Sequence, residues 1–93
     1  MITDSQVETV HIDMWEQAIQ KHGTAEAVPE HESQYISDYT RGMYVIQIWQ
    51  KNDSVGSVLK FMKSYSLPDE MVSRLAHKYC GVKPTKSPMS VEA

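Results

Sequence analysis

The stretch KHGTAEAVPEHESQYISDYTRG, residues Lys21–Gly42, decides how this chain folds. Gly23 stands where a helix commonly stops, and Pro29 pushes the residue before it out of the helical region. Between these two breaks, Thr24 can cap a short helical turn. Residues 34–41 then return to a helical spacing of apolar side chains. The stretch predicts a helix, a break and a second short helix that ends at Gly42.

The residues before this break predict a longer helix over Asp4–His22. Ser5 with Glu8 matches a capping box at its start. Two apolar stripes run along it, so the apolar arc is wider than a surface helix needs. The stripes are Val7, Val10, Met14 and Ala18, and beside them Ile12, Trp15 and Ile19. The second stripe either widens the core or faces a partner, and we favour the core.

Residues 43–53, MYVIQIWQKND, fit two structures. Their β-branched and aromatic side chains favour a strand, whereas their place between helices favours a helix. We favour an extended conformation. Residues 54–65 return to helical spacing and predict a helix despite Gly56, with Asp53 or Ser54 as its cap.

The clearest helix is predicted in SLPDEMVSRLAHKYCG, residues 66–81. Ser66 is its expected cap, Pro68 fits the first turn, and Gly81 ends it. Its apolar face consists of Met71, Val72, Leu75, Ala76 and Tyr79. The tail, residues 83–93, has two prolines and no periodicity, so we expect it to be flexible.

Length and composition fit one mainly α domain. A chain of 93 residues with 41% hydrophobic and 23% charged residues lies in the range of single globular domains. We expect this domain to cover residues 1–82, as a bundle of four to five short helices. An α+β alternative places one short strand or hairpin around residues 43–50.

Three features favour a cytoplasmic protein that does not enter a membrane. The longest apolar run, residues 43–46, is far shorter than the roughly 20 residues of a membrane span. The first residues, MITDSQVE, lack the layout of a signal peptide. The single cysteine, Cys80, cannot form a disulfide within the chain, which fits a reducing compartment.

The residue patterns do not point to catalysis, a metal or a cofactor. His77 and Cys80 lie one helical turn apart, but a zinc site needs three or four ligands. The other histidines, which have no motif spacing, are His11, His22 and His31. Glycine-rich phosphate loops and nucleophile motifs do not occur in the sequence. We therefore expect a protein that is not an enzyme and has no cofactor.

Charge divides the chain into two unlike parts. Residues 1–53 carry nine acidic and three basic residues, whereas residues 54–93 carry three acidic and six basic ones. The net charge of -3 hides this division. The chain is therefore acidic in its first part and mildly basic in its second.

Residues 22–42 resemble, in part, the helix-turn-helix of phage regulators of the CII and Cro-like kind. TAEAV is similar to the end of the positioning helix, and QYISDYTRG is similar to the recognition helix. The resemblance implies a DNA-binding transcriptional regulator, which can be dimeric. The residues that would face DNA are Gln34, Tyr35, Ser37 and Arg41. Charge opposes this, because DNA affinity depends on Lys and Arg, and acidic residues outnumber basic ones here.

The same acidic residues favour the interpretation that we prefer. It is a small non-catalytic module of the inhibitor or adaptor type, of phage or mobile-element origin, that docks an acidic face on a basic surface of a partner protein. The expected partner-binding residues are Glu26, Glu30, Glu32, Tyr35, Asp38, Tyr39 and Trp15. The DNA-binding regulator and a small subunit of a larger assembly stay open as alternatives, and so does the oligomeric state.

Overall fold

The computed structural model describes residues 1–52 and 56–83. Within them the chain forms four helices and no strand: α1 (Asp4–His22), α2 (Glu30–Lys51), α3 (Val58–Lys63) and α4 (Asp69–Cys80). The mainly α class is confirmed, and the alternative with a strand around residues 43–50 is wrong because α2 runs through them. The predicted flexible tail lies outside the described residues except for Lys83.

The bounds of α1 are those that the sequence predicts, but its cap lies earlier. Thr3 has an extended backbone, and its Oγ1 accepts a hydrogen bond from the backbone N–H of Gln6 at 3.1 Å. The side chain of Gln6 accepts in turn from the backbone N–H of Thr3 at 2.9 Å. The predicted box of Ser5 with Glu8 is therefore wrong, because both residues already lie inside the helix. Gly23, with φ 98°, ends α1 as expected.

The longest helix, α2, differs most from the prediction. The expected end at Gly42 and the extended segment after it do not occur, because the helix continues through both to Lys51. Since α2 packs against α1, α3 and α4, it buries side chains around much of its circumference. Val45 and Ile46 are buried by these neighbours, and tertiary packing here outweighs their preference for strands.

Gly42 lies buried in the middle of α2, where α4 comes close. A Cβ atom on Gly42 would collide with the Leu75 side chain of α4. Glycine at this position is a contact residue between two helices rather than a helix end.

The helix α3 is shorter than predicted. Gly56 has φ 75° and lies before the helix, and Ser57 is the cap, with its Oγ accepting from the backbone N–H of Lys60 at 3.5 Å. The predicted caps, Asp53 and Ser54, lie outside the described residues.

The helix α4 follows the prediction except at its start. Pro68 is the residue before the helix, whereas the predicted cap Ser66 has φ 62° and lies in the preceding turn. The predicted apolar face is buried at Met71, Val72, Leu75 and Ala76, and Tyr79 is half-buried. Gly81 ends the helix in the left-handed conformation, as expected.

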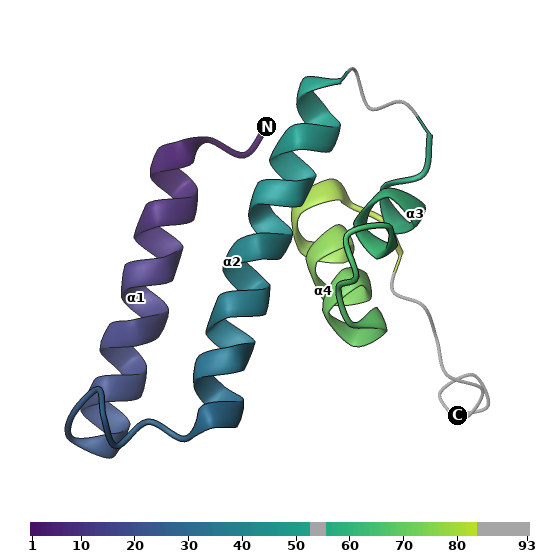
Figure 1. Ribbon diagram of the computed structural model, residues 1–93. Coiled ribbons are helices and arrows are strands. Elements are labelled where there is room, and N and C mark those ends of the chain that lie inside the picture. The colour runs from purple at the N-terminus through teal and green to yellow at the C-terminus, as the bar shows by residue number, and fades with distance from the viewer. Residues whose placement is uncertain (53–55, 84–93) are drawn as a thin grey trace.

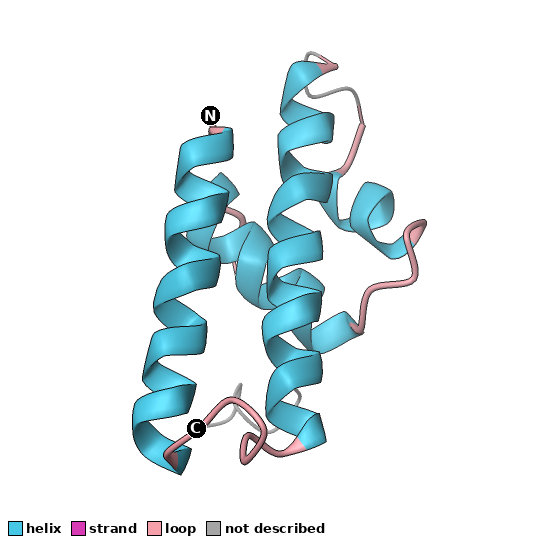
Figure 2. Cartoon of the chain, turned by 60° about the vertical axis from the view of Figure 1, so that its left-hand side comes forward, coloured by secondary structure: helices cyan, strands magenta, loops and turns pink. Residues whose placement is uncertain are grey.

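The four helices are arranged around α2. Figure 1 shows α1 and α2 as an antiparallel hairpin, with α3 and α4 on the other side of α2, and the turned view in Figure 2 keeps α1 beside α2. Among these helices, α1 packs against α2 alone, whereas α3 and α4 pack against α2 and against each other. One long side of α1 is therefore left without a neighbouring helix.

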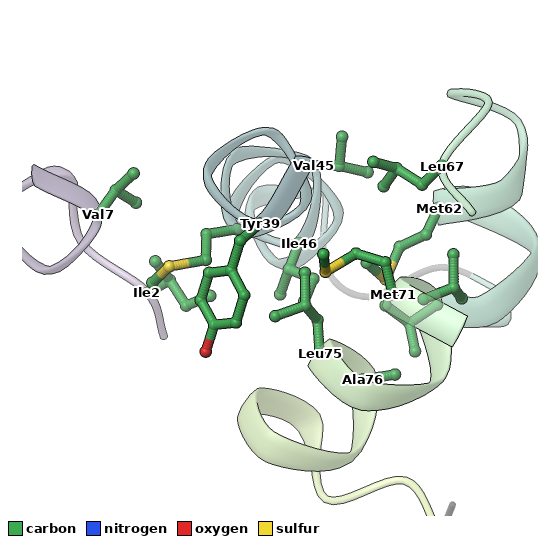
Figure 3. Packing of buried hydrophobic residues seen from close by; sticks show 13 residues of the cluster. Ile2, Val7, Tyr39, Val45, Ile46, Met62, Leu67, Met71, Leu75 and Ala76 are labelled. Carbon is green, nitrogen blue, oxygen red and sulfur yellow. The ribbon is translucent and has the colours of Figure 1, made fainter. Parts of the chain in front are cut away.

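The core is built around α2, with side chains of α3 and α4 on one side of it and Ile2 and Val7 on the other. Figure 3 shows Ile46 pointing toward Leu75 of α4, and Val45 pointing toward Leu67 in the connection before α4. The buried polar residue Gln47 donates to the backbone oxygen of Ile2 at 3.3 Å and to Oδ1 of Asp4 at 2.7 Å, which fastens the N-terminus to α2. In residues 1–52 and 56–83, none of the helices is long and apolar enough to cross a membrane.

Candidate functional site

One flank of α1, beside the side chains that face α2, combines apolar and acidic side chains. Glu8, Ile12 and Glu16 follow one another at four-residue intervals, so they lie along one side of the helix. Both glutamates are exposed, and Ile12 is 49% exposed. Trp15 and Ile19 lie beside this row and are half-buried. We call these five residues the outer α1 face.

The outer α1 face corrects the expectation that the second apolar stripe widens the core. Neither Ile12, Trp15 nor Ile19 belongs to the core cluster or to the side chains packed against it. The sequence shows two stripes but not how many helices pack against α1. Among the helices of the described residues, only α2 packs against it.

The carboxylates of this face have no internal cation. Among the described residues, no ion pair involves Glu8 or Glu16. Lys21 is the one lysine or arginine of α1, and it lies in the last turn of the helix. The outer α1 face therefore presents uncompensated negative charge around an exposed isoleucine.

Glu32, by contrast, is engaged inside the hairpin. Nε2 of His22 donates to both carboxylate oxygens of Glu32, at 3.1 and 3.0 Å, and Lys21 and His31 lie 3.9 Å away. The hydrogen bond from His22, together with the positive charge of Lys21, lowers the pKa of Glu32, although burial opposes the shift. This predicted partner-binding residue fastens the last turn of α1 to the first turn of α2.

Asp38 is also engaged within the chain. Its Oδ1 accepts from Nε2 of Gln34 at 3.1 Å and from Arg41 at 3.4 Å, and its side chain is 14% exposed. Arg41 donates in addition to the backbone oxygen of Tyr65 at 2.8 Å. Two of the four residues that the helix-turn-helix resemblance assigns to DNA, Gln34 and Arg41, thus hold internal bonds.

The remaining residues of the DNA assignment are placed differently. Ser37 and Tyr35 are exposed on α2. Residues 24–28, which the resemblance places in a helix, form the turn between α1 and α2, where Oγ1 of Thr24 accepts from the backbone N–H of Ala27 at 3.2 Å. The resemblance itself stays a prediction.

The two predicted tyrosine anchors differ in exposure. Tyr39 is 6% exposed, and its hydroxyl lies 3.1 Å from that of Tyr79, so it belongs to the core and not to an exposed surface. Burial, and then the hydrogen bond with Tyr39, raises the pKa of Tyr79 to about 12. Tyr35 is 39% exposed and is available to a partner.

The acidic stretch that the sequence singles out is therefore divided. Glu26 and Glu30 are exposed at the hairpin turn, whereas Glu32 and Asp38 are bound internally. Of the aromatic residues predicted for binding, Trp15 lies on the outer α1 face.

A groove runs along the other edge of α1, between α1 and α4. It consists of a hollow of about 400 Å³ between α1 and α4 and an adjoining hollow of about 410 Å³ between α1 and the first turns of α2, and the two share Met14, Gln17 and Tyr35 as lining residues. The α4 wall carries Arg74 and Lys78, and the end of the α1 wall carries Lys21. We call this the α1–α4 groove.

The sequence predicts Trp15 as a binding residue and leaves open that its apolar stripe faces a partner, but the prediction includes neither the two glutamates of the outer α1 face nor the α1–α4 groove. Glu8 and Glu16 could have been found from their four-residue spacing about Ile12. Arg74 and Lys78 belong to the basic back half of the chain, but only the fold brings them opposite α1. In residues 1–52 and 56–83, no group of three His, Cys, Asp or Glu residues could hold a metal ion.

Comparison of the chain with protein-family models, with curated proteins and with solved structures finds no match.

Proposed function

We propose that the chain is a non-catalytic protein-binding module of the inhibitor or adaptor type, which docks the outer α1 face on a basic surface of a partner protein. One observation carries this proposal: Ile12 is half exposed between two glutamates that have no ion-pair partner among the described residues. An isolated apolar side chain on a surface is ordinary, but here it continues into Trp15 and Ile19.

The two kinds of side chain would contribute differently to binding. Burying the exposed half of Ile12 stabilises a complex by about 1 kcal/mol, and Trp15 can act as an aromatic anchor beside it. The glutamates at the rim speed and orient docking rather than add much affinity, and their effect falls as salt rises. The exposed carboxylates of Glu26 and Glu30 add negative charge at the hairpin turn.

Affinity capture with matched variants tests this proposal. The variant Glu8→Gln with Glu16→Gln removes two charges from the outer α1 face and leaves side-chain size unchanged. The control Asp69→Asn with Glu70→Gln removes two exposed charges from the first turn of α4, where the side chains are 85% and 88% exposed and lie 3.8 and 3.9 Å from Lys63 and Arg74.

The full chain and both variants are used to capture proteins from a cell lysate at low and at high salt, and the captured proteins are identified by mass spectrometry. We expect one basic protein to be captured by the full chain and by the control at low salt, and to be lost from the Glu8 and Glu16 variant. Equal capture by all three chains would refute the proposal.

A further inference from the structure

The α1–α4 groove has one wall on each of two helices that do not pack against each other. On α1, Val10, Met14 and Gln17 follow at helical spacing and face the groove. On α4, Arg74 and Lys78 lie one turn apart and face it from the other side. Tyr35 and the largely buried Tyr39, both on α2, line it between the two walls.

The cations of the α4 wall are only weakly compensated within the chain. Arg74 lies 3.9 Å from Glu70, and both side chains are more than half exposed, so this pair contributes little. Lys78 lies near the rings of Tyr39 and Tyr79, at 6.0 and 5.6 Å, and among the described residues it has no carboxylate partner. The wall therefore offers two positive charges that a bound anion can neutralise.

The apolar part of the groove lies beside these cations. Tyr35 is 39% exposed and shares both hollows with Met14, while the Arg74 guanidinium stands 5.9 Å from the Tyr35 ring centroid. Against these cations, Asp13 is the one acidic residue that lines the hollow next to α4, and Glu32, which is bonded to His22, lines the adjoining hollow. An apolar surface with a positive edge complements a segment that is apolar on one face and negative along the neighbouring edge.

We propose that the α1–α4 groove binds a short, acidic, amphipathic helix of another protein. The α1 wall from Val10 to Lys21 is about three helical turns long, which sets the length of the occupant. Two carboxylates one turn apart on that helix would meet Arg74 and Lys78, because residues four apart on two helices have the same spacing. This site is separate from the outer α1 face and does not depend on it.

Synthetic peptides test the inference. The probe is a sixteen-residue, alanine-based helix with three leucines along one face and two glutamates, one turn apart, along the neighbouring edge. A matched peptide carries lysines in place of the glutamates. Binding to the full chain is measured by fluorescence anisotropy and located by amide chemical shifts in the NMR spectrum.

The glutamate peptide should bind and shift the amides around Met14, Tyr35 and Arg74. The lysine peptide should bind roughly fivefold more weakly or worse, as two partly exposed ion pairs would give. In the variant Arg74→Gln with Lys78→Gln, the two peptides should bind equally, whereas the Glu8 and Glu16 variant should behave as the full chain does.

No binding of the glutamate peptide, or equal binding of both peptides to the full chain, would overturn the inference. The inference would also be overturned if the groove amides shifted with protein concentration alone and sedimentation showed a dimer. That result would assign the groove to a second copy of the chain.

Discussion

Gly42→Ala should destabilise the domain although alanine is the better helix former. An alanine in place of an interior glycine stabilises a helix by about 1 kcal/mol. At Gly42, however, the new methyl group meets the side chain of Leu75. Leu75 and the neighbouring Met62 are both fully buried, so neither can move aside into solvent.

The magnitude follows from these two opposing effects. Overpacking a well-filled core costs about 1–3 kcal/mol. Subtracting the gain in helix propensity leaves a net destabilisation of about 1 kcal/mol. In a Leu75→Ala background, which itself costs about 2–5 kcal/mol, the collision is gone. There the same Gly42→Ala change should stabilise the domain by about 1 kcal/mol, so its sign reverses.

The coupling between positions 42 and 75 is measured by urea unfolding, followed by circular dichroism. The four chains compared are the unaltered chain, Gly42→Ala, Leu75→Ala and the double variant. Ser37→Ala is the control, because Ser37 is exposed on the same helix and reports propensity alone, with an expected gain of at most about 0.7 kcal/mol. If Gly42→Ala changed the free energy of unfolding equally in both backgrounds, α2 and α4 would not touch at this point and the packing argument would fail.

Two further predictions concern ionisable groups. His22 and its neighbours hold the pKa of Glu32 below 4.5, so the folded chain binds fewer protons at this carboxylate than the unfolded chain does. The stability that ionised Glu32 contributes is therefore present above the usual carboxyl pKa and is lost as the pH falls through the lowered pKa. Urea midpoints should therefore fall less steeply on acidification for Glu32→Gln than for the full chain, and parallel curves would count against the His22 bond. The pKa of Tyr79 is raised from 10.0 to about 12, so the stability that its protonated hydroxyl contributes is fully present below pH 10.0 and is lost as the pH rises through about 12. Tyr39→Phe removes the hydrogen bond and should lower the pKa of Tyr79, as read by ultraviolet titration of the phenolate, and an unchanged titration would contradict the bond.

The C-terminal ends of α1 and α4 could be predicted from the residues next to them in the sequence. Gly23 and Gly81 both have positive φ angles that favour glycine, and each follows a run with regular apolar spacing. These signals depend only on neighbours in the sequence. The same holds for the apolar face of α4, where one row of side chains meets the core.

The second half of α2 could not be predicted in the same way. Its apolar residues lie on several sides of the helix because three other helices pack around it, so no single row stands out. Gly42 looks like a stop signal locally, but it is required by the approach of Leu75, which lies 33 positions further along the chain. Contacts between distant segments decide this element.

For the candidate site, the sequence prediction was right for some residues and wrong for others, and the reason is similar in both cases. Glu32 is one of several equivalent acids in the sequence, and only closure of the hairpin brings His22 within hydrogen-bond distance of it. Ile12 is part of a wide apolar arc, and only the absence of a second helix beside α1 in the described structure leaves it exposed. Sequence spacing identifies these residues but not their neighbours.

Site-specific photo-crosslinking tests the proposed binding surface most directly. A photoreactive phenylalanine derivative replaces Ile12 in one chain and, as a control, Lys60 on α3 in another, since Lys60 is exposed and lies outside both candidate surfaces. After irradiation in cells, position 12 should give one covalent adduct with a partner protein, and position 60 should give none. No adduct at position 12, or the same adduct at position 60, would contradict the assignment of the outer α1 face.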